Sequence, residues 1–226
     1  RSSDFPKRHI ADHTGISFSG YRHPYRSRRN PELRTNRCKE PATKKMFSEI
    51  AGNADTENML AEYNAGFKQD MRRFLKSDEG MISGAEFHVR RNTGSFGTIN
   101  YMANQDGFTL YDTVAYNYRH NEANGEDNRD GSEFNYSWNC GIEGATRKQR
   151  EQQMRNAFLM LLLSQGTPMI YGGDEFANSQ AGNNNAWCQD NAVGWTDWKN
   201  VKKQENLSTF VKEAIAFRKK HPILHM

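Results

Sequence analysis

Short apolar runs that end in polar residues predict two strands in this chain. The clearest run, at 99–103, breaks abruptly into Asn, Gln, Asp and Gly at 104–107. A buried parallel strand has this appearance when its carboxyl end delivers polar groups into a site. A second short strand is expected at 169–171, where Gly-Gly-Asp-Glu follows it.

Apolar residues at helical spacing predict three helices in this chain. Asn64 can cap the first helix. Thr146 and Gln149 form a capping box at the start of the second, which Gly166 ends, and the third covers 207–220. The residues expected to face inward are Phe67, Met71, Phe74 and Leu75 in the first, Met154, Ala157, Phe158, Leu161 and Leu162 in the second, and Phe210, Val211, Ala214 and Ile215 in the third.

Two connections separate these elements. Residues 81–97, rich in Gly and Arg, are expected to form a loop, and 113–145 form a longer one that is rich in Asn, Asp, Gly and Glu. A loop of that length inside a domain is usually functional or disordered, and the aromatic residues along it favour order. Those rings either pack the loop onto the domain or offer their faces to sugars. The 127–131 segment resembles a calcium loop only in part, so no metal is expected.

Charge divides the chain into two parts. Residues 1–45 carry 12 Lys or Arg and 4 Asp or Glu, whereas the whole chain has a net charge of only +4. The low hydrophobicity of this basic head predicts a poorly structured segment at 1–58, followed by a domain at 59–226. Its arginines also suit an arm that binds anions or nucleic acid. No recognised nucleic-acid-binding fold accompanies them, so nucleic acid is not the expected partner.

Cysteine usage and hydropathy exclude several classes of protein. The three cysteines, Cys38, Cys140 and Cys188, are odd in number and include no CxxC pair, so we expect neither a zinc site nor a disulfide framework. This pattern favours a reducing compartment, and a cytoplasmic protein is expected. No membrane partner is expected, because no apolar run approaches the roughly 18 residues that span a bilayer and no signal peptide is visible.

Four blocks of sequence, in order, resemble the alpha-amylase superfamily and within it the isoamylase and glycogen-debranching type. They are the segments 98–112, 120–128, 163–175 and 182–191. The first resembles the seventh-strand motif of that family, a hydrophobic strand that ends in His-Asp, followed by Gly-Phe-Thr-Leu-x-Asp. The resemblance covers roughly residues 60–226. It implies the α/β class and the C-terminal part of a (β/α)8 TIM barrel, strands and helices six to eight, with long βα loops. By this resemblance the sixth strand ends just before Asn64.

The resemblance also implies an activity. Family members of this type hydrolyse α-1,6 branch linkages in glycogen-like α-glucans by a retaining mechanism, without a cofactor. By this resemblance Asp106 is the carboxylate that stabilises the transition state. The alternative is that Asp106 is a buried structural acid. Gln105 stands where the family has His; its amide can donate a hydrogen bond to a sugar, but it cannot titrate near neutral pH.

The resemblance also implies further contacts with the substrate. The candidates are Asp174, Asn183, Asn184, Asn185 and Trp187. For the three asparagines an equally good interpretation is that they satisfy nearby backbone groups.

The two other carboxyl groups that this chemistry needs are not found. The family's nucleophile and acid/base follow its fourth and fifth strands, and residues 1–60 contain no Arg-x-Asp within a hydrophobic strand. We therefore expect the chain to be inactive alone. Three strands also leave open sheet edges, which predicts a need for the missing part of the parent enzyme. The expected substrate is a branched α-glucan such as glycogen or starch. The alternative is a degenerate, non-catalytic homologue that binds α-glucan.

Overall fold

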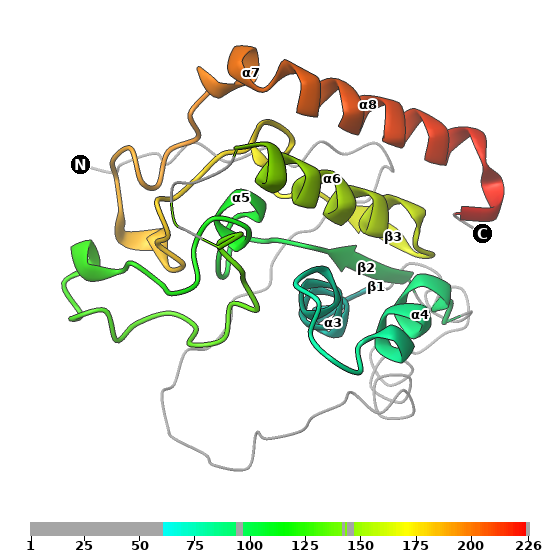
Figure 1. Ribbon diagram of the computed structural model, residues 1–226, viewed down its shortest axis with the longest axis horizontal. Helices are drawn as coiled ribbons and strands as arrows, with labels where there is room; N and C mark the ends of the chain where they lie inside the picture. The colour runs from blue at the N-terminus through cyan, green and yellow to red at the C-terminus, as the bar shows by residue number, and fades with distance from the viewer. Residues whose placement is uncertain (1–60, 94–96, 142, 144–146, 225–226) are drawn as a thin grey trace, which may run out of the picture. The chain divides into compact units, whose positions relative to one another are not determined.

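A three-stranded parallel sheet forms the centre of the described chain. The computed structural model describes residues 61–93, 97–141, 143 and 147–224. Strands β1 (Ala61–Tyr63), β2 (Gly97–Tyr101) and β3 (Thr167–Met169) pair side by side in chain order. Helices lie between successive strands and after the last (Figure 1). The expected α/β class with a parallel sheet is therefore confirmed.

The three predicted helices are present. They are α3 (Ala65–Leu75), α6 (Arg147–Leu163) and α8 (Glu205–Lys220). Helix α3 packs on β2, α6 packs on α3, and α8 packs on α6 (Figure 1). Asn64 caps α3 as predicted, because its side chain accepts a hydrogen bond from the Phe67 backbone at 3.0 Å.

The buried faces of these helices follow the predicted periodicity with one error. The five apolar residues expected in α6 are almost fully buried, and the four large side chains among them each contribute about 1.5–3 kcal/mol of hydrophobic stabilisation. In α3, Phe67, Met71 and Leu75 are buried, but the prediction for Phe74 was wrong, since it is 37% exposed. The buried face of α3 instead includes Arg72, which is only 3% exposed.

Helix α8 is anchored to α6 by a buried arginine. Val211 and Ala214 are buried as expected. Arg218 donates to the carbonyls of Leu162 and Ser164, both at 2.7 Å. A cation at these positions satisfies orphan carbonyls at the carboxyl end of α6 and complements the helix dipole.

The prediction of a loop at 81–97 was wrong, because this segment contains helix α4 (Ile82–Arg90). Its buried residues are small or polar: Ala85 and His88 face α3, whereas Phe87 is 56% exposed. His88 contacts the Asp70 carboxylate at 3.2 Å. A helix that buries alanine and histidine and exposes phenylalanine lacks the apolar stripe on which the prediction depends.

Strand β3 lies two residues earlier than predicted. The expected 169–171 strand was placed after Pro168, but Pro168 pairs with Asn100 inside the strand. Proline is tolerated because β3 is an edge of the described sheet. Gly166, at φ +90°, approaches the Thr98 carbonyl so closely that a Cβ would lie 2.9 Å from it. Glycine therefore turns the chain from α6 directly into the strand.

Short elements complete the described chain. They are α5 (Leu110–Thr113), η1 (Glu122–Asn124), η2 (Asp174–Phe176), η3 (Ala186–Cys188), α7 (Asn200–Lys203) and η4 (Pro222–Leu224). The predictions for the 1–58 segment, Cys38 and the Thr146 cap lie outside the described residues. Within the described ranges, no helix combines the length and apolar character that crossing a bilayer requires.

Candidate functional site

The loop that follows β2 presents two polar side chains to solvent. Gln105 and Asp106 are exposed, whereas the residues before them at 98–104 and after them at 108–110 are buried. Because the three strands are parallel, this loop and the segment after β3 lie at the same edge of the sheet (Figure 1). Asp106 is thus an accessible carboxylate at the carboxyl end of a buried strand. The alternative of a buried structural acid is wrong for Asp106.

Arg72 holds both ends of this loop. From α3 its Nε donates to the Met102 carbonyl at 2.7 Å, and its Nη2 donates to the Phe108 carbonyl at 3.1 Å. Its Nη1 reaches the carbonyl of Asn135 in the long loop, also at 3.1 Å. Burial lowers the pKa of Arg72 to about 10, and the charge of Asp174 partly opposes that shift. The guanidinium therefore stays charged at neutral pH and fixes three backbone carbonyls at once.

Two further contacts fix the middle of the loop. Lys68 Nζ lies 3.4 Å from Asn104 Oδ1 and 3.4 Å from the Asp106 carbonyl. On the other side, the Gly107 N–H donates to the Asn184 carbonyl at 3.1 Å. The structure thereby brings the Gln105–Asp106 tip beside the asparagine loop, as the family resemblance led us to expect.

Asn184 ties its loop to the long loop through buried amides. Asn121 Nδ2 donates to Asn184 Oδ1 at 2.8 Å, and the Asn184 N–H donates to Asn121 Oδ1 at 2.9 Å. Asn184 Nδ2 also donates to the Ser132 carbonyl and to Asn135 Oδ1. Asn121, Asn135 and Asn184 are all buried. Because these amides satisfy one another, Asn184 has a structural role here.

The neighbouring asparagines extend the same network. Asn183 Nδ2 donates to Asn124 Oδ1 at 2.8 Å, and Asn185 Nδ2 donates to Asp130 Oδ2 at 2.8 Å. Asn124 Nδ2 reaches that same carboxylate oxygen at 2.7 Å. These contacts favour the interpretation that Asn183 and Asn185 satisfy local polar groups. Direct contact with a sugar stays a prediction for both.

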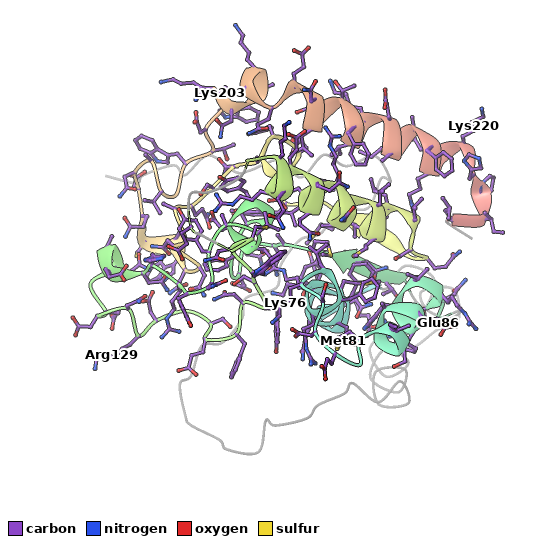
Figure 2. All side chains as sticks on the ribbon, viewed as in Figure 1. Lys76, Met81, Glu86, Arg129, Lys203 and Lys220 are labelled. Atoms are coloured by element: carbon purple, nitrogen blue, oxygen red, sulfur yellow. The ribbon has the colours of Figure 1, made fainter. Side chains whose placement is uncertain are left out.

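Trp187 lies beyond this network on η3 and is 84% exposed. Trp195, on the same loop system, is 59% exposed, and its Nε1 donates to Asp190 Oδ1 at 3.1 Å. On the long loop, the Arg129 side chain pairs with Asp127 and points away from the helices and the sheet (Figure 2). An exposed indole face suits the apolar CH face of a sugar ring. The predicted substrate contact by Trp187 is therefore sterically accessible.

Asp174 and Asp112 are buried carboxyl groups behind the site. Asp174 Oδ1 accepts a hydrogen bond from the Leu110 N–H at 2.9 Å, and Asp112 Oδ2 accepts one from the Gln180 N–H at 2.8 Å. Burial raises the pKa of Asp174 to about 8 and that of Asp112 to about 6. Since Asp174 is 3% exposed, it supports α5 from inside, and the predicted substrate contact has no support from its position.

Burial of Asp174 predicts that stability falls as pH rises. Its folded pKa of about 8 exceeds the ordinary 3.8, so the folded chain binds more protons than the unfolded chain between these values. The free energy of unfolding should therefore drop by about 2 kcal/mol from pH 6 to pH 8 on account of this group. Urea unfolding of the wild-type chain across that range measures the change.

The matched variant is Asp174→Asn, which keeps an oxygen acceptor for Leu110 but cannot ionise. Its unfolding free energy should lose about 2 kcal/mol less than that of the wild type between pH 6 and pH 8. Equal slopes for the two proteins would show that Asp174 does not titrate in this window.

The described residues contain no group of three or more His, Cys, Asp or Glu that could hold a metal ion. Within the same ranges, Cys140 is a buried free thiol and Cys188 an exposed one. The partial calcium-loop pattern at 127–131 thus has no ligand cluster in the described part of the chain.

Comparison with known proteins identifies relatives over most of the chain. No protein-family model matches it. The glycogen operon protein GlgX homolog of Mycobacterium tuberculosis is 42% identical over 181 residues, which is 73% of this chain and 25% of that protein. The glycogen debranching enzyme of Dickeya chrysanthemi is 42% identical over 178 residues, and isoamylase 3 of rice is 39% identical over 189. The chain spans about a quarter of the length of these curated relatives.

Solved structures agree in fold. A pullulanase from Anoxybacillus sp. LM18-11 superposes on 78% of this chain with a TM-score of 0.57 and 22% identity, and the match covers 24% of that enzyme. A pullulanase from Bacillus acidopullulyticus covers 74% of this chain with a TM-score of 0.55 and 18% identity. Over the matched residues, the chain is homologous to these isoamylases and glycogen debranching enzymes.

Proposed function

We propose that this chain is part of a glycoside hydrolase that removes α-1,6 branches from glycogen-like or starch-like α-glucans. Relatives about 40% identical carry the names glycogen debranching enzyme and isoamylase, and a structural neighbour is complexed with maltotetraose. Residues 59–226 would supply consecutive βα repeats of a (β/α)8 barrel, in which the carboxyl ends of the strands carry the chemistry. Cytoplasmic location stays a prediction.

The observation that carries this proposal is the exposure of Asp106, together with Gln105, at the tip of a loop whose flanking residues are buried. Glycoside hydrolysis passes through a transition state with oxocarbenium character, which a nearby carboxylate stabilises electrostatically. Arg72 and Asn184 hold the loop from behind, so the position of Asp106 is set before a sugar arrives. The Gln105 amide would donate a hydrogen bond to a sugar hydroxyl, and Trp187 would stack against a ring.

The nucleophile and the acid/base of the retaining mechanism are assigned to residues outside the matched stretch. These two groups must lie about 5 Å apart, on either side of the scissile bond. In this proposal the isolated chain binds α-glucan without cleaving it, and the missing part of the parent enzyme completes the site.

The test combines glucan retention with product release. We expect the purified chain to be retained on a glycogen matrix and Trp187→Ala to lose about tenfold in affinity, equivalent to 1.4 kcal/mol. Phe87→Ala, at a ring that is 56% exposed on α4 and outside both loops, is the matched control and should bind normally. Reducing ends from a branched glucan should not exceed those from Asp106→Asn.

Two results would contradict this proposal. Equal retention of the wild type, Trp187→Ala and Asp106→Asn would show that this surface does not bind α-glucan. Reducing ends that the wild type releases and Asp106→Asn does not would show that the chain holds its own nucleophile. A chain that binds glucan but stays inactive when combined with the missing part would instead support the degenerate homologue.

A further inference from the structure

We propose that Lys68 is a positioning residue, which holds Asp106 in place for an α-glucan and releases it when the amine loses its proton. This inference rests on the proposed function, because it adds a supporting residue to the same site. Neither the family resemblance nor the sequence pattern pointed to Lys68, which lies among the apolar positions of α3.

The geometry of the loop gives Lys68 a place of its own. Arg72 fixes the two ends of the loop through the Met102 and Phe108 carbonyls, and Asn184 fixes Gly107. Between these anchors, in the described part of the chain, the hydrogen bonds to Asn104 and Asp106 come from the Lys68 amine at 3.4 Å each. The tip that carries Gln105 and Asp106 therefore depends on this one amine.

The Lys68 amine is also held from below. Its Nζ lies 5.6 Å from the centre of the Tyr101 ring, a cation–π distance, and the Tyr63 ring meets Tyr101 edge-on at 5.9 Å. The two oxygen atoms and the Tyr101 ring therefore contact the ammonium group itself and not only the alkyl part of the side chain. A neutral side chain of similar length would fill the space without making these contacts.

The charged and titratable groups that face Lys68 in the described residues come from three elements. Arg72 lies on its own helix, Tyr101 on β2, and Asp106 on the loop. Burial and the charge of Arg72 lower the pKa of Lys68 to about 8, and Asp106 partly opposes that shift. Burial raises the pKa of Tyr101, so that ring stays neutral in the same range.

The consequence is a change of charge at mildly alkaline pH. With a pKa of about 8, the amine is roughly nine-tenths protonated at pH 7 and one-tenth protonated at pH 9. Loss of the proton removes the cation–π attraction and weakens both hydrogen bonds, since charged donors make stronger ones. The loop should then loosen around Asp106 while its two ends stay fixed by Arg72.

Titration of maltohexaose binding by calorimetry, from pH 6.5 to pH 9.5, tests this inference. The wild-type chain should lose about fivefold in affinity between pH 7 and pH 9, following the fraction of charged amine. Lys68→Arg should bind equally at both values, because guanidinium does not deprotonate. Lys68→Met should bind weakly and without pH dependence. Lys76→Met, at the end of the same helix, should match the wild type.

Hydrogen exchange of the 102–109 backbone, without glucan, separates this inference from the proposed function. Exchange should speed up in Lys68→Met and, above pH 8, in the wild type relative to Lys68→Arg at the same pH. If the exchange rate of the loop depends on the charge of Lys68 but neither the wild type nor any variant binds maltohexaose, the positioning role of Lys68 is supported and the proposed glucan binding is contradicted. Equal exchange in all three proteins, or an affinity loss that persists in Lys68→Arg, would overturn the inference.

Discussion

Replacing Arg72 by methionine should lower the free energy of unfolding by about 3–5 kcal/mol. Arg72 is 3% exposed and donates to three carbonyls, at Met102, Phe108 and Asn135. Methionine fills a similar volume but leaves these carbonyls without their donor, and each hydrogen bond to a charged group is worth about 1.5–3 kcal/mol. Asp174, whose pKa of about 8 leaves it mostly protonated at neutral pH, would not supply a compensating charge.

The neighbouring residue provides the control. Arg73→Met removes an equal side chain one position along α3, but Arg73 is 35% exposed and pairs with Asp78 at 3.1 Å on the surface. Exposed ion pairs contribute about 0–1 kcal/mol, so the free energy of unfolding of this variant should be at most about 1 kcal/mol below that of the wild type. Urea titrations followed by circular dichroism compare the two variants. Similar losses for both would mean that the three buried contacts of Arg72 add nothing to stability.

Arg72→Lys refines the interpretation. Lysine keeps the charge but has a single ammonium group, so it cannot reach carbonyls on three different segments at once. We expect an intermediate loss of stability. The same variant should disturb the Asp106 loop, because Met102 and Phe108 bound that loop on both sides. Arg72 thus links the stability of the domain to the position of its candidate catalytic carboxylate.

The pattern of apolar and polar residues predicted the helices and strands in which buried residues recur at regular spacing. Helix α6 was found from Met154, Ala157, Phe158 and the residues that follow, because one continuous apolar stripe meets the core. Strand β2 was found from the apolar run at 99–103, although it lies two residues earlier, at Gly97–Tyr101. Helix α4 was missed for the opposite reason, since it buries Ala85 and His88 against α3.

The parts of the site that were missed depend on contacts between distant segments. Nothing near Arg72 in the sequence indicates that it reaches carbonyls 30 to 63 positions away. Likewise, the structural role of Asn184 depends on Asn121, 63 positions earlier. Helix α5 could have been predicted, because Thr109 and Asp112 have capping-box spacing. In the structure the Thr109 hydroxyl accepts a hydrogen bond from the Asp112 N–H at 3.1 Å.

Replacing Gly131 by alanine should lower the free energy of unfolding by about 3 kcal/mol, through two separate effects. Gly131 has a φ of +72°, a conformation that costs an L-residue about 1–2 kcal/mol. A Cβ there would also collide with Asn184 Oδ1 and lie 2.8 Å from Asn121 Nδ2. Because both amides are buried and bonded to each other, neither can move without losing a hydrogen bond.

Gly125→Ala separates backbone strain from collision with the amides. Gly125 lies in the same loop at φ +79°, but a Cβ there would meet no atom within 4 Å. Its alanine variant should therefore lose only the strain, about 1 kcal/mol. Chemical unfolding of both variants gives the difference, which measures how strongly the Asn121–Asn184 pair joins the two loops. Equal losses would show that this pair yields easily. The asparagines would then be free to turn toward a sugar, which would favour their predicted role as substrate contacts over the structural one.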